Sequence, residues 1–217
     1  MKNKNIVGYI VGINIVIFIL QQLIKGFTEH LILVSSEIFQ RPWILITSMF
    51  LHGSLSHLFF NMYALFLFGT LIENKIGSKR FLFVYFVSGI IASFTFSLFR
   101  PEATGLGASG AIMSILGLTI ILLPNLQVLF FFILPMSMRT AGIIFAIIDI
   151  VGLFDTGNGV ANSAHLAGLV VGLIYGKMLL KQKKEFNKNF IKISKKTNNS
   201  EIMSEDQIND YIKYGRL

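Results

Sequence analysis

The chain has 217 residues, of which 53% are hydrophobic and 14% charged, with a net charge of +8 and no cysteine. Soluble domains average about a quarter charged residues, so this composition excludes an ordinary soluble domain, and the lack of cysteine excludes disulfides and thiolate chemistry. Apolar runs of roughly 20 residues, the length that spans a bilayer, recur along the chain. We therefore expect an all-α polytopic membrane protein.

Six apolar segments are expected to span the membrane. They cover about residues 6–24, 57–73, 81–99, 109–123, 140–155 and 163–180. This predicts a membrane domain over 1–181 and a basic, polar tail over 182–217. In the tail, Ser204 to Gln207 is typical of a capping box before a short helix. The N-terminus lacks a small-residue cleavage site after its apolar run, so no cleavable signal peptide is expected.

Two connecting segments are unusually apolar. Residues 25–50 mix apolar stretches with charged side chains and include Trp43, a residue type that favours the headgroup boundary. This predicts an interfacial loop that is partly inserted. Residues 124–139 contain Pro124 and Pro135, which leave too few residues between them to span, so we expect a connector at the membrane face.

The distribution of basic residues predicts the orientation. Six spans place both termini on one side, and the flanks on that side carry Lys2, Lys4, Lys75, Lys79, Arg80, Arg139, Lys177, Lys181, Lys183 and Lys184. The flanks on the other side carry Lys25, Arg41 and Arg100. By the positive-inside rule both termini are cytoplasmic. The remaining positive charge, in the tail, favours contact with anionic lipids, worth about 1 kcal/mol per basic residue near the surface, over a nucleic-acid partner.

The second span carries polar residues at its beginning. Such residues are functional candidates by default, because they are costly in hydrocarbon. His57 and Asn61 are four residues apart and share one helix face. Ser54 or Ser56 can cap this helix, which leaves His52 in the preceding turn. Asn61 alone would indicate interhelical hydrogen bonding, but this cluster favours a functional site.

The sixth span carries a stripe of small residues at four-residue spacing: Ala164, Gly168, Gly172 and Gly176. Such a stripe allows the backbone of another helix to approach closely. His165 adjoins the first member of the stripe, so a helix packed there also lies near an imidazole.

The fourth span is the expected partner of this stripe. It begins at Ser109, and its fifteen residues reach only about 22 Å, short of a hydrocarbon core of roughly 30 Å. The glycine-rich segment 104–108 must then enter the membrane as irregular backbone, which is tolerated only where it is buried in protein or lines a wet cavity. We expect Ser109 at a recessed helix N-terminus beside water.

This position favours nucleophilic chemistry at Ser109. Unpaired N–H groups and the helix dipole stabilise negative charge at a helix N-terminus, as an oxyanion requires. Serine needs a base to accept its proton, and histidine titrates in the suitable range. His165 is the expected base, and His57 and Asn61 are the expected oxyanion donors.

These motifs, in this order, resemble the rhomboid family of intramembrane serine proteases over about residues 40–180. The motifs are HGSLSHLFFNM (52–62), LIENKIGSKRF (71–81), GASG (107–110) and AHLAGLVVG (164–172). The resemblance implies a six-helix bundle with a short fourth helix and a serine–histidine dyad, with no acidic third member. It also implies no cofactor and no metal, and membrane-protein substrates cut within or near a spanning helix.

The resemblance also implies roles for individual residues. Ser109 matches the nucleophile and His165 the base, while His57, Asn61 and the Ser109 N–H match the oxyanion hole. Gly107 and Gly110 match the glycines that shape the turn, and Glu73 and Arg80 match a structural motif that ties helices together. From the residues themselves, His52 is a supporting position at the site, and Gly168 and Gly172 are structural positions in the stripe. Two positions depart from the common pattern: Ile44 follows Trp43 in place of arginine, and Met113 replaces an aromatic residue.

Other readings stay open at this point. Asp149 in the fifth span could complete a Ser-His-Asp triad, although we expect it only to face the bundle interior or a wet pocket. His52, His57, Asp149 and His165 could instead form the proton relay of a transporter or channel. A zinc site made of three histidines is less favoured, since no His-Glu-x-x-His helix is present. An inactive relative that binds membrane clients is disfavoured by the intact serine and histidine.

Overall fold

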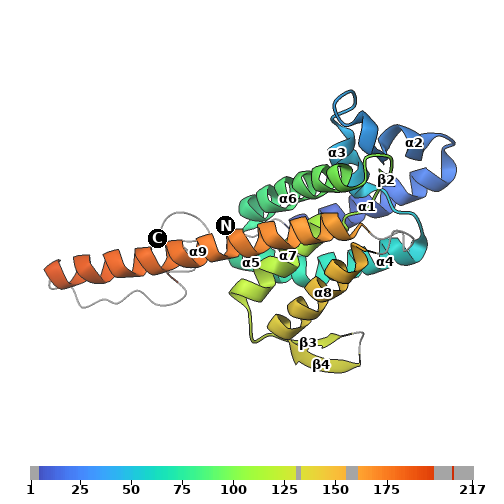
Figure 1. Cartoon of the computed structure of the whole chain (residues 1–217). Helices are drawn as coiled ribbons and strands as arrows, with labels where there is room; N and C mark the ends of the chain where they lie inside the picture. The colour runs from blue at the N-terminus through green and yellow to red at the C-terminus, as the bar shows by residue number, and fades with distance from the viewer. Residues whose placement is uncertain (1–4, 131–132, 155–160, 198–206, 208–217) are drawn as a thin grey trace.

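The computed structural model describes residues 5–130, 133–154, 161–197 and Gln207. Within these residues six long helical segments occupy the predicted ranges. They are α1 (Ile6–Leu23), α4 (Leu55–Ala64) with η3 (Leu65–Gly69) and α5 (Thr70–Ile76), α6 (Ser78–Phe99), α7 (Ser109–Leu122), α8 (Met138–Gly152) and α9 (Asn162–Thr197). Figure 1 shows a helical bundle from which α9 extends as a long rod. The capping box at Ser204 lies outside the described residues.

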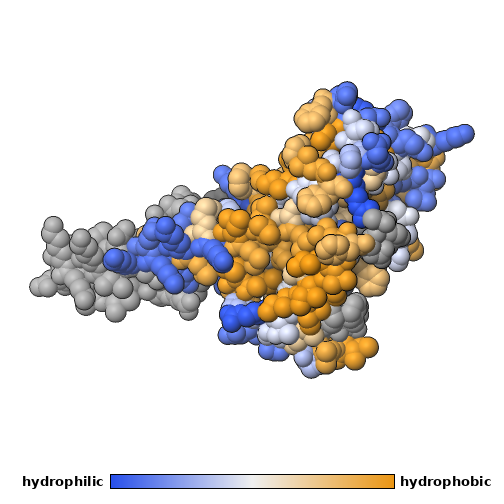
Figure 2. Space-filling view, viewed as in Figure 1, coloured by the Kyte–Doolittle hydropathy of each residue, from blue (hydrophilic) through white to orange (hydrophobic). Residues whose placement is uncertain are grey.

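Four of these segments are long and apolar enough to cross a membrane: Ile6–Leu23, Leu55–Ile76, Ser78–Phe99 and Asn162–Phe186. Figure 2 shows hydrophobic side chains over the bundle and hydrophilic ones around the α2–α3 region and along the extension of α9. The chain is therefore a multi-pass membrane protein. Six crossings stay a prediction, because α7 and α8 have 14 and 15 residues.

The predicted interfacial loop has its own structure. It contains α2 (Phe27–Leu31), β1 (Leu33–Val34), η1 (Ser35–Glu37), α3 (Ile44–Thr47) and η2 (Ser48–Phe50). β1 pairs antiparallel with β2 (Thr104–Gly105), which places Leu33 opposite Gly105. The loop is therefore attached to the glycine-rich segment that leads to α7.

The connector over 124–139 does not form a spanning helix. β3 (Gln127–Phe130) pairs antiparallel with β4 (Leu134–Ser137), with Gln127 opposite Ser137. The prolines of this segment predict a connector, as observed, but they do not predict the hairpin.

Contact between α7 and α9 forms the centre of the bundle. A Cβ added at Gly168 would overlap the carbonyl oxygen of Gly110, and one at Gly172 would overlap that of Ser114. On the α7 side, a Cβ at Gly117 would lie 2.6 Å from the Leu169 carbonyl oxygen. The two backbones thus touch directly, which confirms the predicted partner of the stripe. α7 is correspondingly enclosed, with every residue from Gly110 to Thr119 buried.

Glu73 joins α5 to the beginning of α1. Its carboxylate accepts hydrogen bonds from the backbone N–H groups of Ile6 and Val7, both at 3.1 Å, and from Ser78 Oγ at 2.6 Å. These N–H groups lie in the first turn of α1, where no backbone acceptor is available, so the carboxylate fulfils a helix-tying role. Arg80 Nη1 is buried with no hydrogen-bond partner in the described part of the chain, so the observed tie runs through Glu73.

α9 continues beyond the predicted end of the sixth span at 180. It reaches Thr197 without a break, and its continuation over 181–197 is rich in Lys, which favours helix. Lys181 and Glu185 lie one turn apart with their charged atoms separated by 3.9 Å. Helical structure therefore does not end at the predicted domain boundary at 181.

Replacing Gly172 by alanine is expected to destabilise the protein by roughly 1–3 kcal/mol, because the new methyl group overpacks the α7 contact. Gly12→Ala is the matched control: a Cβ at Gly12 on α1 meets no atom within 4 Å, so this change is expected to be neutral or slightly stabilising. Thermal unfolding in detergent compares the two variants, and equal melting temperatures would contradict the close α7–α9 contact.

Candidate active site

Ser109 is the first residue of α7, as predicted. The backbone before it is irregular: Gly107 has φ +119°, a conformation that glycine adopts readily and other residues do not. The N–H of Gly107 donates to the Ser48 carbonyl at 2.9 Å. A Cβ at Gly107 would lie 2.8 Å from the His57 ring. The backbone that leads to Ser109 is therefore enclosed by other parts of the protein, and Gly107 allows it to lie close to the His57 imidazole.

His165 lies in the first turn of α9 and faces Ser109. Its Nε2 is 2.8 Å from Ser109 Oγ, a separation typical of a hydrogen bond. The contact follows from the stripe, because the carbonyl of Ala164 and the Cα of Gly168 lie against Gly110. The structure brings together the serine and histidine that the sequence singled out, from positions 56 residues apart.

Asp149 occupies the other side of the imidazole. Its Oδ1 lies 3.0 Å from His165 Nδ1, and its side chain is 7% exposed. Asp149 faces the bundle interior as expected. The resemblance implied no acidic member, but Ser109, His165 and Asp149 lie in hydrogen-bonded order in the structure.

His57 and Asn61 lie on α4, which is capped by Ser54, whose Oγ accepts from the His57 N–H at 3.1 Å. The His57 ring contacts the position of Gly107 and so lies beside the turn that precedes Ser109. Asn61 Nδ2 donates to the His57 carbonyl at 2.9 Å, which leaves a second N–H on the same amide.

His52 packs against the ring of His57. It is 1% exposed, and its ring lies edge-on to that of His57, with centroids 5.0 Å apart. Burial and the neighbouring His57 lower the pKa of His52 to about 4, although the backbone of Phe50 opposes this shift. Neither ring nitrogen makes a hydrogen bond of standard geometry within the described residues, so His52 packs as a neutral ring.

Two positioning residues were missed by the sequence analysis. The Gln21 side chain accepts from the His52 N–H at 3.0 Å and donates to the His52 carbonyl at 3.4 Å, which attaches the turn to α1. Ser48 accepts from Gly107. Both contacts are hydrogen bonds to backbone groups, those of His52 and Gly107. No motif or spacing in the sequence indicates such a contact.

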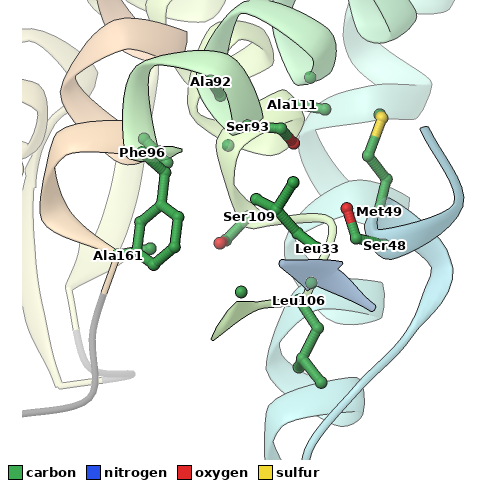
Figure 3. A pocket seen from close by; sticks show the side chains of 15 residues that line it. Leu33, Ser48, Met49, Ala92, Ser93, Phe96, Leu106, Ser109, Ala111 and Ala161 are labelled. Atoms are coloured by element: carbon green, nitrogen blue, oxygen red, sulfur yellow. The ribbon is translucent and has the colours of Figure 1, made fainter. Parts of the chain in front are cut away.

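A small cavity of about 30 Å³ adjoins Ser109, enough for roughly one or two water molecules. Figure 3 shows Ser109 with Phe96 and Ala161 on one side and Leu33 and Ser48 on the other. This confirms that Ser109 lies beside a space large enough for water. In the described part of the chain, no three His, Cys, Asp or Glu residues gather closely enough to hold a metal ion.

Comparison with known proteins gives one consistent result. A family model described as Rhomboid domain matches residues 40–182. Rhomboid protein 1, mitochondrial, from Saccharomyces cerevisiae is 32% identical over 183 residues, which cover 80% of this chain and 53% of that protein. Rhomboid protease GluP from Bacillus subtilis is 38% identical over 134 residues, 60% of this chain and 24% of that protein.

A human protein, Presenilin-associated rhomboid-like protein, mitochondrial, is 34% identical over 181 residues. That alignment covers 76% of this chain and 46% of the human protein. The chain thus spans between about a quarter and about half of the length of these relatives.

Lowering the pH from about 6.5 to about 4 is expected to destabilise the protein through His52. The unfolded side chain binds a proton near pH 6.5, whereas the folded one does so only near 4, so stability is lost as the pH falls through this window. The loss is roughly 3 kcal/mol, from about 1.4 kcal/mol per pKa unit.

The measurement is thermal unfolding between pH 7 and 4 for the wild type, His52→Leu and His30→Gln. His30 is exposed on α2, so His30→Gln keeps this part of the pH dependence and His52→Leu loses it. Parallel curves for the two variants would show that burial of His52 is not the cause.

Proposed function

Since this chain belongs to the rhomboid family, we propose that it is an intramembrane serine endopeptidase that hydrolyses peptide bonds within or near transmembrane segments of membrane proteins. The observation that carries the proposal is the 2.8 Å contact between Ser109 Oγ and His165 Nε2 at the N-terminus of a helix in a multi-pass membrane protein. The match to a Bacillus subtilis rhomboid protease supports it.

In the proposed reaction Ser109 is the nucleophile and His165 the general base. The Ser109 proton moves to His165 Nε2 as Oγ bonds to the carbonyl carbon of the scissile peptide. The C–N bond then breaks, and the leaving amine takes the proton from Nε2. The acylated Ser109 remains, with the N-terminal part of the substrate attached.

The oxyanion formed in this step is proposed to lie at the beginning of α7. The first N–H groups of a helix have no intrahelical acceptor, and the dipole favours negative charge there. The N–H of Ser109 is one proposed donor. His57, which lies against Gly107, and Asn61, through its second amide N–H, are the others. Preorganised donors of this kind are worth about 3–4 kcal/mol each in other serine proteases.

Release of the acyl group needs water within a membrane protein. The cavity beside Ser109 supports this step, because its volume of about 30 Å³ suits one or two water molecules. The base that accepted the serine proton can then activate a water for attack on the acyl carbon.

The proposed substrates follow from the apolar outer surface of the bundle. The bundle presents apolar side chains outward, among them Phe59 and Phe60 of α4, which are both 56% exposed. Substrates that share the membrane are the natural partners of such a surface. A spanning helix hides its peptide groups in backbone hydrogen bonds, so stretches with small, helix-destabilising residues are the proposed sites of cleavage.

The proposed topology keeps both termini in the cytoplasm and opens the active site toward the other side. α9 carries Lys181, Lys183 and Lys184 near the end of its candidate span at Phe186, and Lys188 just beyond it. Anionic headgroups are the proposed partners of these lysines.

Labelling with a fluorophosphonate probe tests the nucleophile and base directly. Detergent-solubilised wild type is expected to react at Ser109 and to cleave a model transmembrane substrate without added metal or nucleotide. Ser109→Ala and His165→Ala are expected to lose both properties, with cleavage reduced at least about 10³-fold. Gel fluorescence and mass spectrometry of the labelled peptide provide the readout.

Ser114→Ala is the matched control, because Ser114 lies on the same helix but pairs with Ser88 Oγ at 2.7 Å. This variant is expected to keep the label. Normal cleavage by Ser109→Ala would refute the proposal. Solute flux in proteoliposomes that survives Ser109→Ala but not Asp149→Asn would favour the transporter reading instead.

A further inference from the structure

The imidazole of His165 has a different partner at each ring nitrogen. Nε2 lies 2.8 Å from Ser109 Oγ and Nδ1 lies 3.0 Å from Asp149 Oδ1. A neutral imidazole carries one N–H and one lone pair. Which nitrogen carries the proton therefore decides whether His165 can accept the proton of Ser109.

An ionised carboxylate selects between the two forms. It can only accept hydrogen bonds, so Nδ1 must donate to Asp149 and Nε2 keeps its lone pair toward Ser109. Without the carboxylate, the Nε2–H form could point its proton at Ser109 Oγ, and such a ring cannot act as the base. We propose that Asp149 is a positioning residue that holds His165 in the Nδ1–H form and makes Ser109, His165 and Asp149 a triad.

Burial supports this role for Asp149. Its side chain is 7% exposed, and a buried carboxylate is costly unless it is paired. The other buried carboxylate in the described residues, Glu73, has three donors. Within the same residues, His165 is the one hydrogen-bond partner of the Asp149 side chain. The pairing therefore accounts for a charged residue that otherwise has no reason to face inward.

The fold brings the pair together where α8 ends and α9 begins. Asp149 lies in the last turn of α8 and His165 in the first turn of α9. The two helix ends approach so closely that a Cβ at Gly152 would lie 2.6 Å from Asn162 Nδ2. The side chain of Asp149 thus reaches the His165 ring from the side opposite to α7.

The contact between Asp149 and His165 also stabilises the charged imidazole that forms during the reaction. When His165 takes the proton of Ser109, the ring becomes positively charged in a site with little water. Asp149 then faces that charge at 3.0 Å, and it stays ionised while the proton moves only between Ser109, Nε2 and the leaving amine. The proposal rests on the function proposed above, but the state of the ring can be measured without turnover.

The first test is the tautomer of His165 in the full-length protein. The chain has four histidines, so ¹⁵N-histidine labelling gives four pairs of ring-nitrogen signals, one pair for each imidazole. His165→Ala assigns the relevant pair. We expect the Nδ1–H form in the wild type and in Asp149→Glu, and a shift toward Nε2–H in Asp149→Leu, which has no acceptor. An unchanged Nδ1–H signal in folded Asp149→Leu would overturn the proposal.

The second test separates positioning from folding through kinetics. In Asp149→Leu and Asp149→Asn we expect kcat to fall by about 10²–10⁴-fold, as for the carboxylate of other serine protease triads, with KM little changed. Asp149→Glu should recover most of this loss. Glu73→Gln is the matched control: it removes the other buried carboxylate, and it should lower the unfolding temperature but not kcat per folded molecule.

If Asp149→Leu does not fold, Asp149→Asn decides. Its amide has the shape of the carboxylate but can turn its NH₂ group toward Nδ1, which then offers a lone pair and leaves the proton on Nε2. A kcat within about twofold of wild type in Asp149→Asn would overturn the proposal. Full activity of Ser109→Ala would instead refute the proposed function. The tautomer measurement would still test the role of Asp149, because it does not depend on turnover.

Discussion

Direct backbone contact between α7 and α9 is the constraint on which the site depends. The positions of Gly168 and Gly172 leave no room for a side chain, because the carbonyl oxygens of Gly110 and Ser114 occupy that space. Ordinary helix pairs pack with their axes 8–10 Å apart, and larger side chains at these positions would hold the helices apart. A serine and a histidine, each with a short side chain, could not then meet at 2.8 Å. The small residues of the stripe are thus a condition for the chemistry as well as for packing.

A second constraint acts on the approach to Ser109. The N-terminus of α7 can stabilise an oxyanion only if the preceding backbone does not cover its N–H groups. Irregular backbone inside a membrane also needs hydrogen-bond partners for its own polar groups. The protein supplies them through the β1–β2 pairing and through Ser48, which accepts from Gly107. The positive φ of Gly107 turns the chain and leaves room for the His57 ring. The loop between α1 and α4 is therefore part of the site, although it contributes none of the reacting groups.

Sequence reasoning identified the features that depend on local patterns. The start of α7 at Ser109 and the stripe on α9 each follow from residue type and spacing, and the structure has both. A serine cap on α4 was also predicted, at Ser54 or Ser56, and the structure has it at Ser54. Contacts that depend on how distant backbones meet were not predictable in this way. Gln21 reaches the backbone of His52 across 31 positions, and the β3–β4 hairpin forms in a segment whose prolines indicated only that it cannot span. Asp149 was noticed as a polar residue in an apolar helix, but its distance from His165 depends on the crossing of α8 and α9.

The position of α8 gives this last contact a particular character. One face of α8 packs inward through Met138, Ala141 and Gly142, while Ile143, Ile147 and Val151 are more than half exposed on its outer side. α8 is therefore a peripheral helix that carries a carboxylate to a central imidazole. Since Ser109 and His165 come from the two helices in closest contact, their separation is fixed by the core, whereas the separation of Asp149 from His165 depends on how α8 lies against it. A hydrogen bond between N–H and a carboxylate weakens steeply with distance and angle, so a small displacement of α8 changes the orientation of the base without moving the nucleophile. The contact between α7 and α9 thus brings Ser109 and His165 together. The position of α8 determines which tautomer of His165 faces Ser109.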